Sequence, residues 1–258
     1  IKTFSSKEEH GEGEEAEGGG GGFRRGGGGQ KIPADSGLNR FVWNMRYPDA
    51  TSVPGAVMWS GGVRGPLVAP GKYQVRLTFG KENRTESFEI KKDPRLSTTQ
   101  ADFQKQLDLL LKVRDKLTEL DEAVIAIRDI RKQTNDEVQK LGKLPAKDTI
   151  ASTAKRMNKK FSDIEEELLQ VKSKASEDPL NFPIKLNDKL AGVGSVVESA
   201  DAAPTKQSYD LYDELAGKID AQLAKYKQTL DTELPAFNAL VRNENVPAVI
   251  LKPAEKNK

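Results

Sequence analysis

The sequence contains no cysteine and one histidine, His10, which lies in a low-complexity stretch near the start. The absence of cysteine excludes disulfides, thiol catalysis and cysteine-ligated metals. A lone histidine in a loop does not build a histidine metal site or the usual serine triad. Aromatic residues make up only 6% of the chain, which disfavours an all-β protein. No apolar run approaches the roughly 20 residues that span a bilayer.

Neither sign of charge is in excess, since 41 basic residues face 39 acidic ones for a net charge of +2. No global field therefore draws the chain to nucleic acid or to an anionic membrane. Acidic residues interleave with lysine and arginine at helical spacing, as at Asp115, Glu119, Asp121, Glu122 and Glu165–Glu167. That pattern is typical of solvated helix faces. The sequence thus predicts no catalytic residue, no metal ligand and no cofactor, and it leaves open whether the chain is an enzyme.

A low-complexity stretch covers about residues 7–36, with acidic residues first and then glycines around Arg24 and Arg25. Glycine loses more backbone entropy on ordering than any other residue, and little apolar surface is present to offset that cost. We expect a disordered loop. An RGG-like nucleic-acid segment is the alternative, but a single arginine pair, one phenylalanine and an acidic half favour an expanded hairpin loop.

Residues 38–92 show the alternation of apolar and polar side chains that is typical of half-exposed antiparallel strands. With a strand ending at Phe4, the count reaches about five or six strands. This pattern predicts a small Ig-like antiparallel β-sandwich over residues 1–95, with a hairpin turn at 81–84. The low-complexity stretch then joins its first two strands. The alternating apolar positions are Phe41, Trp43, Tyr73, Val75, Leu77, Phe79, Phe88 and Ile90.

From Ser97 the apolar residues recur at helical spacing. Thr98 or Thr99 is the expected N-cap, with Asp102 completing a capping box. The first stripe lapses at Arg131 and Thr134, and three further stripes predict helices over about 150–171, 186–197 and 209–240. Together they predict an antiparallel four-helix bundle over residues 96–258 with a short apolar C-terminal tail, so the chain is α+β with two domains. Arg131 marks either a polar layer or the point where the first helix outruns its partners.

Aromatic side chains offer the main candidates for ligand contact. Trp43 and Tyr73 lie on expected strands, where aromatics usually belong to the core. Trp59 lies in a Gly/Pro-rich loop and is the better candidate for an exposed contact with a sugar or peptide. Tyr47 and Arg64, which lie in the same loop, complete the predicted binding residues.

Residues 37–43, 70–77 and 93–95, which read GLNRFVW, PGKYQVRL and DPR, carry a family resemblance. They resemble the C-terminal region of bacterial sortilin-like, BNR-repeat β-propeller proteins, often labelled glycosyl hydrolases or sialidase-like. Proteins of that kind carry a propeller, then an Ig-like sandwich, then a helical region. Asn44 departs from the aspartate that the family often has after the tryptophan.

The resemblance implies a non-catalytic accessory or scaffolding region of an exported protein, located in the periplasm or outside the cell. Its partner is the upstream propeller, which would hold any chemistry of the parent. The alternative is a carbohydrate- or peptide-binding module that assists hydrolysis by the parent. Because the chain starts at Ile1 and shows no signal peptide, we expect it to be a piece of a longer protein.

Overall fold

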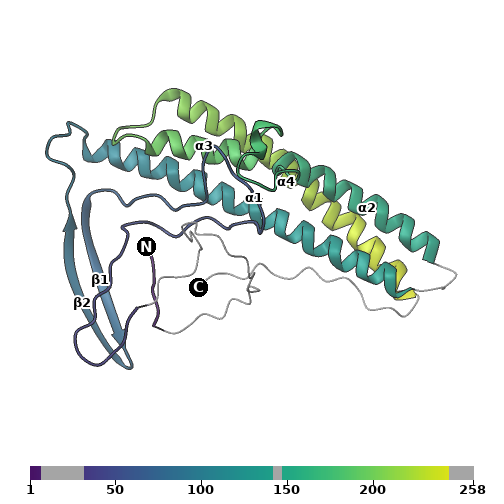
Figure 1. Cartoon of the computed structure of the whole chain (residues 1–258), viewed down its shortest axis with the longest axis horizontal. Helices are drawn as coiled ribbons and strands as arrows, with labels where there is room; N and C mark the ends of the chain where they lie inside the picture. Colours follow the sequence, from purple (N-terminus) through teal and green to yellow (C-terminus); the bar gives the residue numbers. More distant parts are fainter. Residues whose placement is uncertain (7–31, 142–146, 244–258) are drawn as a thin grey trace.

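The computed structural model describes residues 1–6, 32–141 and 147–243. Within these ranges the chain forms an antiparallel ribbon and a helical bundle (Figure 1). The predicted flexible loop at about 7–36 and the apolar C-terminal tail lie largely or wholly outside the described residues. The elements are β1 (Gly71–Phe79), β2 (Glu82–Ile90), α1 (Gln100–Lys140), α2 (Lys147–Leu168), the short 3-10 helix η1 (Asp178–Leu180), α3 (Leu186–Glu198) and α4 (Lys206–Asn243).

The predicted Ig-like β-sandwich is wrong. The described residues contain a single two-stranded sheet, and the segment around Phe41 and Trp43 forms no strand. Its one ladder contact is an isolated bridge between Arg46 and Leu67. Strand pairing stops there because Met45 has a left-handed backbone, with φ of 56°, and the prolines that follow cannot donate to a ladder.

The hairpin itself has a regular register from Gly71 opposite Ile90 to Phe79 opposite Glu82. The turn is therefore Gly80–Lys81, which is shorter than the predicted turn at 81–84. Gly80 has φ of 60°, a value that a two-residue hairpin turn of type II′ requires at its first position. Both edges of this ribbon lie next to no other strand of the described residues.

Helix α1 begins as the sequence predicts. Thr99 is the N-cap, and its side chain accepts from the backbone N–H of Asp102 while the Asp102 carboxylate accepts from the backbone N–H of Thr99. This reciprocal capping satisfies two amides that the helix leaves unpaired. The buried stripe does not lapse, because Ile130 and Thr134 continue it, and the Thr134 hydroxyl donates to the carbonyl of Ile130 at 2.7 Å.

The four helices do not alternate in direction along the chain, as the predicted antiparallel four-helix bundle requires. Glu165 of α2 lies beside Arg128 and Arg131, and the carbonyl of Val197 in α3 lies beside Gln106, so the two helices lie at different positions along α1. Both run antiparallel to α1 (Figure 1). Lys116 of α1 pairs with Asp220, and α4 runs parallel to α1 (Figure 1). A cross-section of the bundle therefore contains three helices, α1, α4 and either α2 or α3, because α2 and α3 follow each other along α1.

A polar layer joins α1 to α2. Arg128 and Arg131 donate to the two oxygens of Glu165 at 2.7 and 2.6 Å, and Glu165 is 3% exposed. Of the two interpretations of Arg131, this ion pair agrees with the polar layer. Glu165 does not belong to a solvated face, whereas its neighbours Glu166 and Glu167 are exposed. A buried carboxylate shared by two guanidinium groups favours one alignment of the two helices.

Replacing Glu165 with alanine should lower the free energy of unfolding by about 2 kcal/mol, because two cations then face the core without their partner. The value lies below that for a fully buried pair because both arginines keep about a third of their side chains exposed. Urea unfolding measures the change. The control, Glu166→Ala, removes an exposed acid from the same turn and should cost under about 0.5 kcal/mol. Equal losses in the two variants would contradict the polar layer.

Asp121 is another acid that the sequence pattern assigned to a solvated face, and the structure buries it. It is 1% exposed, and its Oδ1 atom has no hydrogen-bond partner among the described residues. Removal from water raises the pKa of Asp121 to about 7, although the charge of Arg128 acts in the opposite direction. Asp121 therefore holds its proton in the folded chain at pH values where the unfolded chain has lost it.

This difference predicts a loss of stability as pH rises from about 4 to about 7, since over that window the folded state binds more protons. In Asp121→Asn the loss should be absent. The free energy of unfolding of the variant should therefore rise relative to that of the parent by up to about 4 kcal/mol across this window, and the difference should stay constant above it. Urea unfolding between pH 4 and 8 measures the difference. The control is Asp136→Asn, an exposed position on the same helix. Parallel curves for the Asp121 variant and the parent would refute a raised pKa.

Candidate functional site

The loop from Arg46 to Val68 lies across the bundle and positions the predicted binding residues. Its two legs are joined by backbone hydrogen bonds, from Tyr47 N–H to the Pro66 carbonyl at 2.9 Å and from Ala50 N–H to the Val63 carbonyl at 2.7 Å. Ala50 and Val53 belong to the same buried core as the helices. The loop is therefore a packed part of the fold.

Asp188 holds the tip of this loop to α3. It is 3% exposed and accepts the backbone N–H groups of Trp59 at 2.9 Å and Ser60 at 2.7 Å. The close approach needs a residue without a side chain, because a Cβ on Gly61 would lie 2.4 Å from the carbonyl oxygen of Ala191. A carboxylate in the first turn of α3 thus satisfies two loop amides that nothing else in the described residues pairs.

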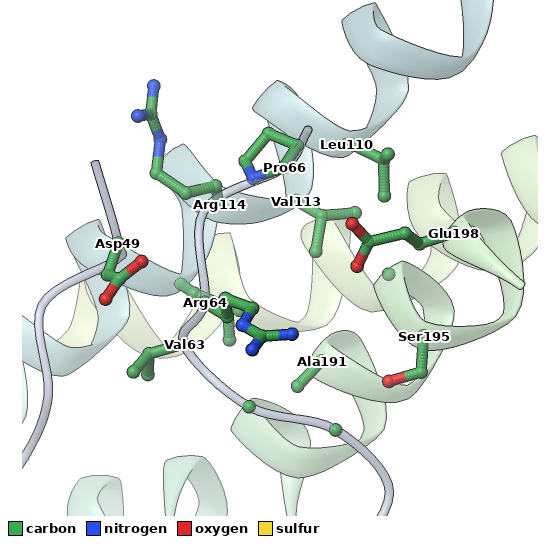
Figure 2. Close-up of a pocket in the computed structure, with 14 residues that line it drawn as sticks. Asp49, Val63, Arg64, Pro66, Leu110, Val113, Arg114, Ala191, Ser195 and Glu198 are labelled. Carbon is green, nitrogen blue, oxygen red and sulfur yellow. The ribbon is translucent and has the colours of Figure 1, made fainter. Parts of the chain in front are cut away.

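A cavity of about 550 Å³ lies between this loop and helices α1 and α3 (Figure 2). Figure 2 shows the Arg64 guanidinium and the Glu198 carboxylate extending into it from the loop and from α3, with Ser195 beside them. Val63, Leu110 and Val113 supply an apolar floor. The volume falls in the range of small-molecule sites.

The charged groups of the cavity differ in how they are held. Glu198 accepts from Arg46 at 2.6 Å, and the same Arg46 nitrogen donates to the Gly65 carbonyl at 2.8 Å. Asp49 accepts the backbone N–H of Gly65 at 2.8 Å. Arg64 is exposed and forms no ion pair with any described residue. The cavity thus offers a free guanidinium and a hydroxyl, while both of its carboxylates already accept hydrogen bonds.

Such a set can bind a polar ligand with apolar patches, because Arg64 and Ser195 can donate hydrogen bonds above the apolar floor. Within the described residues, no group of three or more His, Asp or Glu side chains is arranged to hold a metal ion. No described helix combines the length and apolar content that crossing a membrane requires.

The three predicted binding residues do not all line this cavity. Arg64 does, Trp59 lies next to the Asp188 contact and is 54% exposed, and Tyr47 is half-buried against Phe103 and Leu107. Their role in binding stays a prediction. Sequence reasoning did not single out Arg46, Asp188 or Glu198, because each acts on a partner at least 128 positions away or on loop backbone that a pattern does not reveal.

A second surface lies at the ribbon. Trp43, Tyr73 and Phe88 form an aromatic cluster with ring centroids 5.8–6.4 Å apart. The Tyr73 hydroxyl donates to the Ala69 carbonyl at 2.5 Å, and its partial burial raises the pKa of that hydroxyl. The apolar side chains of β1 become more exposed towards the hairpin turn, where Val75, Leu77 and Phe79 are more than half exposed.

Comparisons of the chain with protein-family models, curated proteins and solved structures gave no match. The two surfaces are therefore interpreted from their own geometry.

Replacing Asp188 with alanine should release the loop tip, since the amides of Trp59 and Ser60 lose their acceptor. We expect a stability loss of about 3 kcal/mol, because each hydrogen bond to a charged group contributes about 1.5–3 kcal/mol. The more specific readout is amide hydrogen exchange at Trp59 and Ser60, which should accelerate more than exchange in α1. Asp213→Ala, an exposed acid on α4, is the control. Unchanged exchange at the two amides would show that Asp188 does not fix the loop.

Proposed function

We propose that the chain is a non-catalytic accessory region whose bundle acts as a rigid support. The observation that carries this proposal is the attachment of the loop to the bundle at several separate places. Besides Asp188, Thr118 accepts from Thr51 N–H at 3.3 Å, and Arg128 donates to the Pro54 carbonyl at 2.8 Å. Attachment at several separated points resists rotation as well as separation, which suits a part that sets the orientation of its neighbours.

The setting of this support comes from the family resemblance alone. Residues 37–43, 70–77 and 93–95 favour a C-terminal region of an exported bacterial β-propeller protein of glycosyl hydrolase-like type. The partner proposed on that basis is the propeller of the same protein, and the location is the periplasm or the cell exterior. The ion pair between Arg46 and Glu198 supports the same role, because it ties the chain just after residues 37–43 to α3.

A second candidate function is a carbohydrate- or peptide-binding module. The exposure of Trp59 favours it, because the indole is presented to solvent while its own backbone N–H is held by Asp188. An aromatic side chain on a fixed backbone loses little entropy when a sugar or a peptide stacks on it. The Arg64 cavity lies on the same loop and offers a donor for a hydroxyl or carboxylate.

The purified chain should hydrolyse no member of a panel of glycans and peptides, because both carboxylates of the cavity, Asp49 and Glu198, already accept hydrogen bonds from the chain itself. Retention of the same panel on immobilised chain separates the two candidate functions. The binding module predicts retention that Trp59→Ala lowers at least tenfold and that Leu211→Ala, which removes an exposed side chain from α4, leaves unchanged. The supporting role predicts equal, background retention in all three proteins. Turnover by the pure chain would contradict the proposed function.

A further inference from the structure

The outer edge of β1 carries unpaired backbone groups. A two-residue turn makes Phe79 and Glu82 a hydrogen-bonded pair, so the odd-numbered residues of β1 bond to β2. The even-numbered residues consequently aim their N–H and C=O groups outward. No described strand pairs with them, and no other backbone group of the described residues bonds to them. The outward residues are Lys72, Gln74, Arg76 and Thr78.

This edge borders a hollow of about 1640 Å³. Seven consecutive residues of β1, 72–78, belong to its lining, as expected for a groove that follows a strand edge. The rest of the lining includes the apolar residues Phe4, Phe41, Trp43 and Met45, together with Ser87, Phe88 and Glu89 of β2. Its volume exceeds the usual range of small-molecule pockets, and its length along β1 fits an extended segment.

The side chains along the edge define what would fit. On one face Tyr73, Val75 and Leu77 form an apolar row. On the other face stand Lys72 and Arg76, neither of which forms an ion pair with a described residue. Lys2 adds a third cation to the lining, against Glu89 as the one acid among the lining residues. A strand added beside β1 would therefore place apolar residues on one face and acidic residues on the other.

We propose that the β1 edge pairs with an extended partner segment in which apolar and acidic residues alternate. The proposal deepens the accessory role and rests on it, since it names the kind of partner that the support holds. Charge argues against a second copy as the occupant. Pairing two β1 edges about a twofold axis normal to the sheet would bring the Lys72 and Arg76 side chains of both copies onto one face, where like charges repel.

The probe is a nine-residue peptide that alternates valine with glutamate, titrated calorimetrically and by the emission of Trp43 in a Trp59→Phe background. We expect saturable binding that is lost when the peptide is N-methylated at alternate residues. Gln74→Pro removes one outward N–H of β1 and should weaken binding at least tenfold. Its control is Ser87→Pro, because Ser87 lies directly opposite Gln74 and aims its N–H at the other edge, where it should have no effect.

A charge-reversed variant tests the proposal independently of the proline substitutions. Arg76→Glu should weaken binding of the valine–glutamate peptide at least tenfold and strengthen binding of a valine–lysine peptide. Failure of the parent chain to bind the first peptide would overturn the proposal, as would equal losses from Gln74→Pro and Ser87→Pro. A parent chain that sediments as a dimer and becomes monomeric in Gln74→Pro would overturn it in favour of a second copy. None of these binding results bears on hydrolysis. The proposed non-catalytic role is therefore tested separately, by the hydrolysis assay described above.

Discussion

The buried stripe of α1 is the constraint on which the rest of the structure depends. Helix α1 has 41 residues and is about 60 Å long, and its stripe is buried from Phe103 to Leu141. Neither α2, with 22 residues, nor α3, with 13, can cover that length alone. They follow each other along it, while α4 covers the remaining side with its 38 residues. Ala50 and Val53 from the loop fill the core where the helices leave it open.

Polar contacts then select one alignment from the many that an apolar stripe allows. Apolar side chains tolerate sliding by one turn, whereas Glu165 must meet both Arg128 and Arg131 to keep its charge paired. Asp188 does the same for the loop, because its two oxygens meet two successive amides. The bundle and the loop are therefore positioned by a few directional bonds within a large non-directional core.

Local patterns in the sequence were enough to predict the helices, and they failed where a partner decides the outcome. Thr99 and Asp102 lie three residues apart, so their capping box is visible in the sequence itself. Glu165 and Asp121 occur in the same sequence pattern as solvent-exposed acids such as Glu166 and Asp136. Only packing against distant residues makes the first two buried and leaves the other two exposed. The alternation in 73–79 predicted the strand and its apolar face correctly. It could not reveal that no second sheet of described residues lies over that face.

The ribbon and the bundle therefore differ in how completely their apolar surfaces are covered. A ribbon of two strands is marginal in water unless one face is packed, and here Trp43, Tyr73 and Phe88 pack only its base. Full burial of an aliphatic or aromatic side chain contributes about 1.5–3 kcal/mol to the free energy of unfolding. Val75, Leu77 and Phe79 lack most of this contribution because they are more than half exposed. A strand lying along β1 would bury part of this surface and pair the outward amides without displacing any contact of the bundle. The ribbon therefore leaves three consecutive apolar positions of β1 exposed, whereas the apolar stripe of α1 is covered by helices and by the loop.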